Sequence, residues 1–381
     1  MRLITDTTEL AQACAKLAAG DFVAVDTEFM RETTYWPKLC LVQIAGEGGE
    51  ALIDPLAETL SLDPLIELMN EPSVLKVFHA ARQDLEIFYH LSGKVPAPLF
   101  DTQVAAAAVG LGDSIAYDAL VRALTDHNVD KSSRFTDWAR RPLSDKQLTY
   151  ALSDVTHLRE LFPRLHARLE KLGRADWLDE EMQTLSAPST YALDPDEAWR
   201  RLKMRKTSPP YLAALKAAAR WREQEAQSRD TPRQRVLKDD VLYEIALQRP
   251  RTADDLAGLR AVPRGFERSR AAKGLLDALG PAIEDPAAHA PKPPKSKPVP
   301  AGTGPVVDLL KVLLRVQAEA HNVAPRLIAT VSDVEQIAAD DEADVPALRG
   351  WRREVFGAAA LKLKRGEGAL RLKRGRIVVE D

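Results

Sequence analysis

Cysteine is nearly absent from this sequence. The 381 residues include two cysteines, Cys14 and Cys40, which lie far apart in the chain. Neither belongs to a metal-ligand spacing, so the sequence excludes a disulfide framework and a cysteine-based zinc site. We expect both side chains to behave as small buried apolar groups.

Long apolar runs are also missing. No run approaches the roughly 20 residues that a membrane-spanning helix needs. The first nine residues are polar, where a secretory signal would have an apolar core. We therefore expect a cytoplasmic protein that does not contact membranes. Hydrophobic residues make up 45% of the chain, and its length suggests two or three domains.

An overall excess of positive charge is absent too, because the formal net charge is −3. The basic residues are nevertheless concentrated: residues 199–238 contain twelve Lys or Arg and three acidic residues, and residues 361–377 contain seven and one. Clustered basic residues are the usual footprint of phosphate contact, whereas net charge says little about partners. We predict that 199–238 contacts nucleic acid, the alternative being a solvated helical face. The candidate contacts are Arg220, Arg233, Arg235 and Lys238.

Short apolar runs and helical patterns alternate over residues 1–200. Runs at 22–25, 39–45 and 51–53 predict strands, and the glycine-rich segment 46–50 predicts a hairpin turn between the last two. Further strands are predicted at 74–78 and 99–100. Helical patterns cover 7–19, 60–70, 83–91, 102–109, 117–125 and 145–172. This alternation predicts a mixed sheet with helices on its faces, an α/β domain. Asp101 precedes a helical run, and we interpret it as a helix N-cap.

The strand signal stops after about residue 200. The pattern of residues 205–285 predicts four or five short helices, which would form an all-α domain. Residues 286–305 contain seven prolines and three lysines, which predicts a solvated linker. Residues 306–381 are again helical in pattern.

Acidic residues in three separate segments carry the chemical signal. Asp26 and Glu28 follow a buried strand, and an i, i+2 pair on a strand points to one face. Tyr150 and Asp154 are an i, i+4 pair on one helix face, and Asp84 lies in a third segment. If the segments meet, four carboxylates converge and repel each other unless cations are bound. Hard oxygen ligands suit Mg²⁺ or Mn²⁺, so the pattern predicts a two-metal centre that cleaves phosphodiesters.

The order and spacing of these motifs resemble the DEDD superfamily of 3′→5′ exonucleases. Tyr150, four residues before Asp154, resembles the DEDDy branch, because the other branch has a histidine five residues before that Asp, where this chain has Thr149. The resemblance implies a ribonuclease H-like mixed sheet over 1–200 and two divalent metal ions. It implies that the catalytic residues are Asp26, Glu28, Asp84, Tyr150 and Asp154, with the four carboxylates as metal ligands. Tyr150 would orient the attacking water.

A second resemblance covers residues 205–285. Trp221-Arg222, Pro232 to Asp240, Ile245, Pro250 and Leu256 form a pattern similar to the HRDC domain. A DEDDy nuclease followed by HRDC resembles the ribonuclease D family, in which 306–381 would be a second, diverged HRDC-like domain. The resemblance implies a metal-dependent 3′→5′ exoribonuclease that releases 5′-mononucleotides, acts in 3′ maturation of tRNA precursors, and needs no obligate protein partner.

Two alternatives remain open from the residues alone. The catalytic motifs are shared with DNA 3′→5′ exonucleases of proofreading or repair type, since the choice of RNA depends on the 2′-hydroxyl. A non-catalytic RNA-binding protein on a nuclease scaffold is the other. Phe29 and Met30 are candidates for stacking on the terminal base, or else core residues. Tyr35 and Trp36, together with Arg31, could line the channel that leads the RNA 3′ end to the acidic residues.

Overall fold

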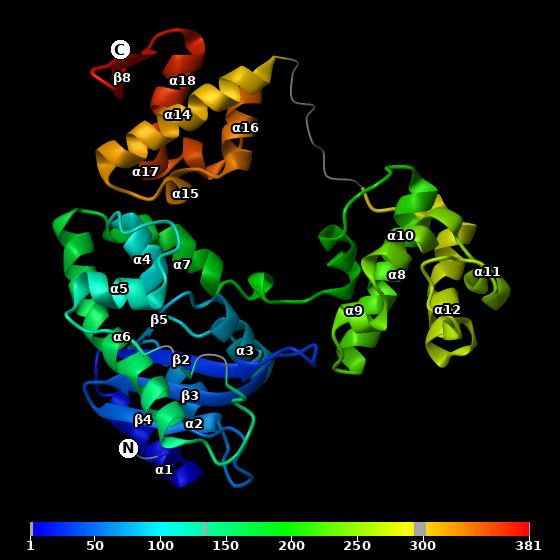
Figure 1. Ribbon diagram of the computed structural model, residues 1–381, viewed down its shortest axis with the longest axis horizontal. Helices are drawn as coiled ribbons and strands as arrows, with labels where there is room; N and C mark the ends of the chain where they lie inside the picture. Colours follow the sequence, from blue (N-terminus) through cyan, green and yellow to red (C-terminus); the bar gives the residue numbers. More distant parts are fainter. Residues whose placement is uncertain (1–2, 131, 134–135, 293–301, 381) are drawn as a thin grey trace. The chain divides into compact units, whose positions relative to one another are not determined.

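The computed structural model describes residues 3–130, 132–133, 136–292 and 302–380, and these form two compact units (Figure 1). The first unit combines 1–28 and 41–190 with the C-terminal residues 297–381. The second combines 191–296 with 29–40. Within the described ranges, no helix has the length and apolarity needed to cross a membrane.

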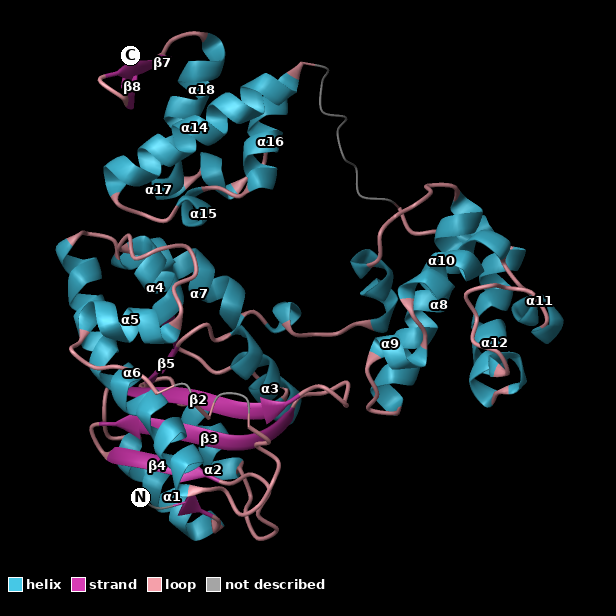
Figure 2. Ribbon diagram, in the orientation of Figure 1, coloured by secondary structure: helices cyan, strands magenta, loops and turns pink. Residues whose placement is uncertain are grey.

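A six-stranded mixed sheet lies at the centre of the first unit (Figure 2). Its order is β1-β4-β3-β2-β5-β6, with β3–β4 antiparallel and β1–β4, β2–β5 and β5–β6 parallel. The strands are β1 (Leu3–Ile4), β2 (Phe22–Met30), β3 (Lys38–Gly46), β4 (Gly49–Ile53), β5 (Leu75–Phe78) and β6 (Leu99–Asp101). The sequence missed β1 and the extension of β2 beyond Val25. The predicted mixed-sheet α/β fold is confirmed.

Helices cover this sheet and supply its core. They are α1 (Thr7–Leu17), α2 (Asp63–Met69), α3 (Arg82–Ser92), α4 (Thr102–Ala108), α5 (Tyr117–Leu124), α6 (Asp145–Lys171) and α7 (Asp179–Ser186). The long helix α6 packs against β4 and β5, and its leucines share one core with α4 and α5. Strand β2 has Val23, Ala24 and Val25 fully buried, as expected of a strand covered on both faces. Cys14 and Cys40 are buried, as predicted.

Asp101 caps α4, as predicted, by accepting the Gln103 backbone N–H at 2.7 Å. Its carboxylate also accepts the backbone N–H groups of Ala80 and Ala81, at 3.0 and 2.8 Å. Ala80 has φ of 58°, an unusual conformation for a residue with a side chain. Asp101 therefore fixes the turn that leads into α3, the helix that carries Asp84.

The C-terminal helices belong to the first unit rather than to a free module. They are α14 (Thr303–His321), α15 (Pro325–Ile328), α16 (Val331–Ala339), α17 (Gly350–Arg352) and α18 (Ala358–Arg365). Trp351 stacks on Trp177 with ring centroids 4.0 Å apart, and the buried Arg352 pairs with Glu180 and Glu181 on α7. Arg174 donates to the carbonyls of Ala108 and Asn322, at 2.7 and 3.1 Å. These contacts join the C-terminal helices to α4, to α7 and to the turn that precedes α7.

Two sequence predictions for this region were wrong. Strands do occur after residue 200, because β7 (Ala369–Lys373) and β8 (Arg376–Glu380) form an antiparallel hairpin. The predicted 286–305 linker is helical at both ends, in α13 (Pro286–His289) and in α14 from Thr303. Proline is tolerated in the first turn of a helix, which is why its presence misled the prediction at residue 286. Residues 293–301 of that linker lie outside the described residues.

The second unit is all-helical around its own core. Its helices are α8 (Pro209–Ser228), α9 (Arg233–Val236), α10 (Asp239–Gln248), α11 (Ala253–Ala257) and α12 (Arg270–Glu284), preceded by the 3₁₀ turn Pro195–Arg201. Leu212, Leu215, Leu242 and Leu275 are buried in this core. The predicted all-α domain is confirmed. The exact domain boundaries stay predictions.

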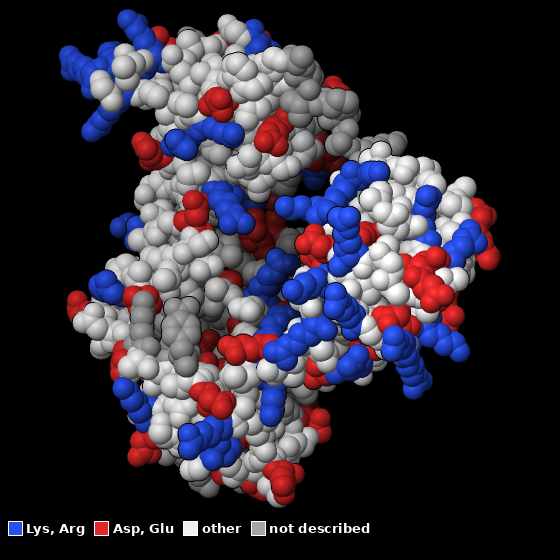
Figure 3. Space-filling model, turned by 45° about the vertical axis from the view of Figure 1, so that its right-hand side comes forward, with Lys and Arg blue, Asp and Glu red and all other residues white. Residues whose placement is uncertain are grey.

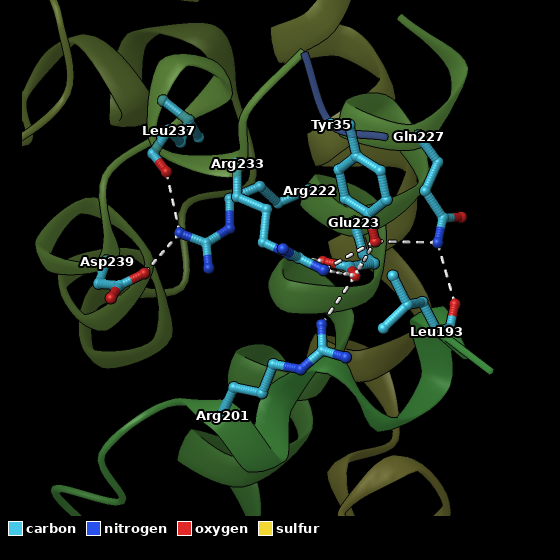
Figure 4. Close-up of polar contacts among 9 residues, drawn as sticks. All are labelled: Tyr35, Leu193, Arg201, Arg222, Glu223, Gln227, Arg233, Leu237 and Asp239. Carbon is cyan, nitrogen blue, oxygen red and sulfur yellow. Dashed lines mark hydrogen bonds and ion pairs between the residues drawn. The ribbon is translucent and has the colours of Figure 1, made fainter. Parts of the chain in front are cut away.

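A buried carboxylate, Glu223 on α8, organises the polar interior of this unit (Figure 4). It accepts the hydroxyl of Tyr35, Arg201 Nη1 at 2.9 Å and Arg233 Nη2 at 2.6 Å. Gln227 donates to the Tyr35 oxygen at 3.1 Å. Burial alone would raise the pKa of Glu223, but the hydrogen bonds from Arg233 and Tyr35 outweigh it and lower that pKa. Tyr35 is therefore an interior residue and not a channel-lining one.

Removing this carboxylate should destabilise the second unit. We expect Glu223→Ala to cost about 3 kcal/mol, the low end for breaking a buried ion pair, because both arginines keep some solvent contact. Glu225→Ala, which removes an i, i+4 pair with Arg229 on the same helix, should cost less than about 0.5 kcal/mol. Native-state hydrogen exchange of α8 and α10 amides measures both. Equal effects from the two variants would contradict the role given to Glu223.

Candidate active site

Three carboxylates meet where β2 passes the middle of the sheet. Oxygen atoms of Asp26, Glu28 and Asp154 all lie within 4.8 Å of one another. Asp26 and Glu28 share a face because strand side chains alternate, and Asp154 comes from α6. The structure thus brings together three of the four carboxylates that the sequence singled out, from two segments far apart in the chain.

The fourth carboxylate, Asp84, is held beside this group. It lies in the first turn of α3, is buried, and accepts the hydroxyl of Thr27, the residue between Asp26 and Glu28. Burial first, and then the charge of Asp26, raise the pKa of Asp84 well above its usual range. Asp84 is therefore close enough to Asp26 for their charges to interact, although it stands outside the group of three.

Tyr150 lies one helical turn before Asp154 on α6, as the spacing predicts, and the two side chains are hydrogen-bonded. The Tyr150 ring lies 6.0 Å from that of the buried Trp138. From α5, Tyr117 donates its hydroxyl to the backbone carbonyl of Asp154. The Tyr150 ring thus lies beside a buried indole, and the helix turn of Asp154 is bonded by a second tyrosine.

The electrostatics of the group are those of crowded acids. Burial, and next the charge of Asp154, raise the pKa of Asp26 well above its usual range. Burial raises the pKa of Asp154 to about 7, although the hydrogen bond from Tyr150 lowers it. Both the desolvation and the repulsion oppose the charged forms. Positive charge bound among these carboxylates would favour their ionised forms.

The donor set suits a hard divalent cation. Carboxylate oxygens are the ligands that Mg²⁺ and Mn²⁺ prefer. Three of them close enough to share one ion, in a site whose crowding disfavours three bare charges, fit such a cation on chemical grounds. A thiol-preferring ion is a poor match, because both cysteines are buried elsewhere in the fold.

The basic stretch 199–238 is divided between structural and exposed roles. Arg233 pairs with Glu223 and lies 4.5 Å over the Tyr35 ring, and the buried Arg222 donates to the Leu237 carbonyl at 2.9 Å and pairs with Asp239. Figure 3 shows Lys and Arg side chains gathered on one visible face of the helical unit. The exposed members of the stretch include Lys203, Arg205, Lys206, Arg220, Arg235 and Lys238.

The other residues predicted to bind RNA lie at the end of β2 and on the surface of the second unit. Phe29 and Met30 are half-exposed at the end of β2, so neither is a core residue. Arg220 pairs with Asp196 at 3.3 Å, and Arg235 donates to the Glu32 carbonyl at 3.5 Å. Lys238 caps the start of α10 with its backbone and has its side chain in solvent.

Sequence reasoning missed three neighbours of the carboxylates: Thr27, Tyr117 and Trp138. Thr27 carried a usable signal, because a hydroxyl between two strand acids in a buried strand needs a partner. Tyr117 and Trp138 carried no sequence signal that could have linked them to the carboxylates. They reach Asp154 and Tyr150 only through the packing of α5, α6 and the chain between these helices.

Comparison with known proteins agrees with this geometry. Residues 1–170 match the family model of the 3′-5′ exonuclease, and residues 211–279 match that of the HRDC domain. Ribonuclease D of Nitrobacter hamburgensis is 54% identical over 99% of both chains, and that of Bartonella henselae is 45% identical over 99% of this chain and 93% of its own. The crystal structure of Escherichia coli RNase D, described as an exoribonuclease involved in structured RNA processing, superposes with a TM-score of 0.83 at 30% identity, covering 96% of this chain and 98% of that one. The motif resemblance is confirmed, and the chain belongs to the ribonuclease D family of 3′→5′ exoribonucleases.

Proposed function

We propose that Asp26, Glu28, Asp84, Tyr150 and Asp154 are the catalytic residues, and that the reaction removes 5′-mononucleotides from the 3′ ends of tRNA precursors. The observation that carries this proposal is the convergence of the Asp26, Glu28 and Asp154 carboxylates within 4.8 Å, beside a tyrosine hydroxyl. The arrangement supplies a cation site and a proton-handling group at one point of the fold.

The carboxylates would hold two Mg²⁺ or Mn²⁺ ions. Asp26, Glu28 and Asp154 would hold one ion, and Asp84 with Asp26 would contribute to holding the second. Bound there, such ions lower the pKa of a water molecule and stabilise the negative charge that develops on the scissile phosphate. Thr27 serves this arrangement by fixing the Asp84 carboxylate through its hydroxyl.

Tyr150 orients the attacking water. Its ordinary pKa of about 10 is too high for a general base at neutral pH, so the hydroxyl acts as a hydrogen-bonding group. The contact with Asp154 and the neighbouring Trp138 ring restrict where that hydroxyl points. Tyr117 helps indirectly, because its bond to the Asp154 carbonyl fixes the helix turn from which the carboxylate projects.

RNA binding falls to other residues. Phe29 and Met30 follow the first motif directly and are half-exposed, so either can stack on the terminal base. The exposed basic residues of 199–238 hold the body of the RNA. An acidic centre repels the phosphates that it must cleave, and a separate cationic surface supplies the attraction. The description of the Escherichia coli relative as acting in structured RNA processing supports a folded substrate such as a tRNA precursor.

Loss of one carboxylate should abolish the chemistry. We expect Asp26→Asn or Asp154→Asn to slow removal of nucleotides from a 3′-extended tRNA precursor in Mg²⁺ at least about 100-fold. Metal ions contribute several kcal/mol to such reactions, and each tenfold in rate corresponds to 1.36 kcal/mol. Single-nucleotide gel resolution of the products is the measurement, with matched single-stranded RNA and DNA oligonucleotides run in parallel.

The control is Asp145→Asn, an exposed aspartate on the same helix, which should retain full activity. In metal-free buffer at pH 8 we expect Asp26→Asn to melt at a higher temperature than the wild type. The raised carboxyl pKa values mean that stability is lost as pH rises through them, so removing one acid relieves that loss. A variant that keeps more than a tenth of the wild-type rate would refute the metal-ligand assignment.

Tyr150→Phe should slow the chemical step by roughly 10²–10⁴-fold, the range for a positioned proton-handling group. RNA affinity should hardly change, because the ring and its packing on Trp138 remain. Single-turnover kinetics at saturating enzyme separate the two effects. A large loss of affinity with an unchanged single-turnover rate would assign Tyr150 to stacking instead.

The exposed basic residues should govern the salt dependence of binding. We expect the triple change Arg220→Gln, Arg235→Gln and Lys238→Gln to weaken tRNA binding and to flatten its salt dependence by up to about 0.7–0.9 per lost phosphate contact. Arg233 is left intact, since its change would also disturb Glu223. Turnover of a short saturating oligonucleotide should stay the same.

The matched control neutralises Arg251, Arg264 and Arg268, three exposed basic residues of the same unit outside the 199–238 stretch. Filter binding across a salt series gives the slope for each protein. If both triple variants shift the slope equally, the effect reflects overall charge, and the stretch is only a solvated face.

A further inference from the structure

Two histidines and a glutamate form a second cluster of metal-ligand side chains, between α6 and the chain that follows α5. His157 and Glu160 lie on this helix, and His127 lies in the chain after α5; ligand atoms of all three fall within 4.8 Å of one another. No step of the nuclease reaction proposed above uses them. We propose that His127, His157 and Glu160 form a binding site for one Zn²⁺ ion, or a similar first-row transition metal, separate from the acidic centre.

The distance between two of the ligand atoms matches the geometry of a zinc site. Zinc bound by histidine nitrogen and carboxylate oxygen has bonds of roughly 2.0–2.2 Å in a tetrahedral arrangement, which places neighbouring ligand atoms about 3.3 Å apart. His127 Nε2 and Glu160 Oε2 are 3.3 Å apart. The His127 and His157 rings have centroids 5.0 Å apart at an interplanar angle of 31°, so small rotations bring both to one ion.

The ligand types select a different metal from that of the acidic centre. Imidazole nitrogen suits zinc, copper, nickel and iron, whereas Mg²⁺ prefers oxygen donors. Two histidines with one carboxylate is a donor set known for Zn²⁺, with a fourth position left for water. Excess Mg²⁺ should therefore occupy the carboxylates around Asp26 without displacing an ion from this cluster.

Neighbouring groups hold the ligands in place. Arg164, one turn along α6, pairs with Glu160 Oε1 and thereby leaves Oε2 for His127. Arg164 also donates to the carbonyl of Leu124, the last residue of α5. The His127 backbone N–H donates to Thr125 Oγ1 at 3.2 Å, and Thr125 Oγ1 donates to the Val121 carbonyl at 2.8 Å. Such outer contacts restrict the orientation of the ligand side chains and of the backbone that carries them.

A bound ion would brace the helices that carry the active site. It would join α6, three residues beyond Asp154, to the chain leaving α5, the helix that carries Tyr117. Both helices contribute to the surroundings of Asp154. The expected role is structural, since an ion bound to the folded state alone stabilises it in proportion to its affinity and concentration.

The chain offers a matched control farther along the same helix. His166 and Glu170 form an i, i+4 histidine–glutamate pair, with Nδ1 and Oε1 3.7 Å apart. The pair is not part of a three-ligand group among the described residues. If any exposed histidine–glutamate pair retained zinc, this one would do so as well.

The experiment compares three full-length proteins: the wild type, the double variant His127→Gln with His157→Gln, and His166→Gln. Each is loaded with Zn²⁺ in excess Mg²⁺ and passed through a desalting column in the same Mg²⁺ buffer. Atomic emission then gives the zinc retained per chain, and Co²⁺ loading gives a visible spectrum that reports coordination. Circular dichroism checks that the variants remain folded.

We expect the wild type and His166→Gln to retain one zinc ion more than the double variant. The affinity of the double variant should fall on the order of 100-fold or more, because losing even an outer contact costs 10–100-fold. Zinc should also raise the melting temperature of the first two proteins only. Equal zinc retention by all three proteins, or no retention by the wild type, would overturn the proposal. Should the double variant fail to fold, Glu160→Gln is compared instead and is held to the same outcomes.

Discussion

The repulsion among crowded and partly buried carboxylates is the constraint on which the nuclease unit is built. Asp26, Glu28 and Asp154 would separate if their backbones could move, and desolvation adds to the cost of ionising them. The fold prevents separation by placing them on its most rigid parts. Strand β2 is buried on both faces, and α6 packs its leucines into the core beneath the sheet. Apolar burial around the site thus supplies the stability that holds the carboxylates together, and the cations that we propose to bind there would offset their repulsion.

The second unit shows the opposite treatment of a buried acid. Glu223 is as deeply buried as Asp84, yet it receives two arginines and a tyrosine hydroxyl, and its pKa falls. Asp84 and Asp154 receive single hydroxyls from Thr27 and Tyr150, and their pKa values rise. The fold thus neutralises the charge of Glu223 with its own residues, whereas Asp84 and Asp154 receive too few donors to stabilise their charged forms. This contrast supports an external cation at the second pair. Perturbed carboxyl groups gathered in one place point to function for this reason.

Sequence patterns correctly predicted the features that depend on interactions between residues close together in the chain. Strand alternation placed Asp26 and Glu28 on one face, helix periodicity paired Tyr150 with Asp154, and the short polar side chain of Asp101 identified a cap. Long-range packing decided the rest. Stacking of Trp177 on Trp351, which links the C-terminal helices to the turn that precedes α7, joins residues 174 positions apart and leaves no periodic signal. The β7–β8 hairpin was missed although β8 contains the short apolar run 377–379, because basic side chains flank that run and dominate the composition of the segment.

The basic stretch shows why counting charges overstates a binding surface. The sequence between 199 and 238 has a large local excess of positive charge, but Arg201 and Arg233 pair with Glu223, and Arg222 is buried against Asp239 and a carbonyl. An arginine whose guanidinium already satisfies a buried carboxylate cannot leave it for a phosphate without exposing an unpaired charge, which costs several kcal/mol. Only the exposed remainder, such as Lys206, Arg235 and Lys238, could contribute to the RNA-binding surface that we propose. The arginines paired with Glu223 and Asp239 act one step earlier, by stabilising the fold that presents the exposed basic residues.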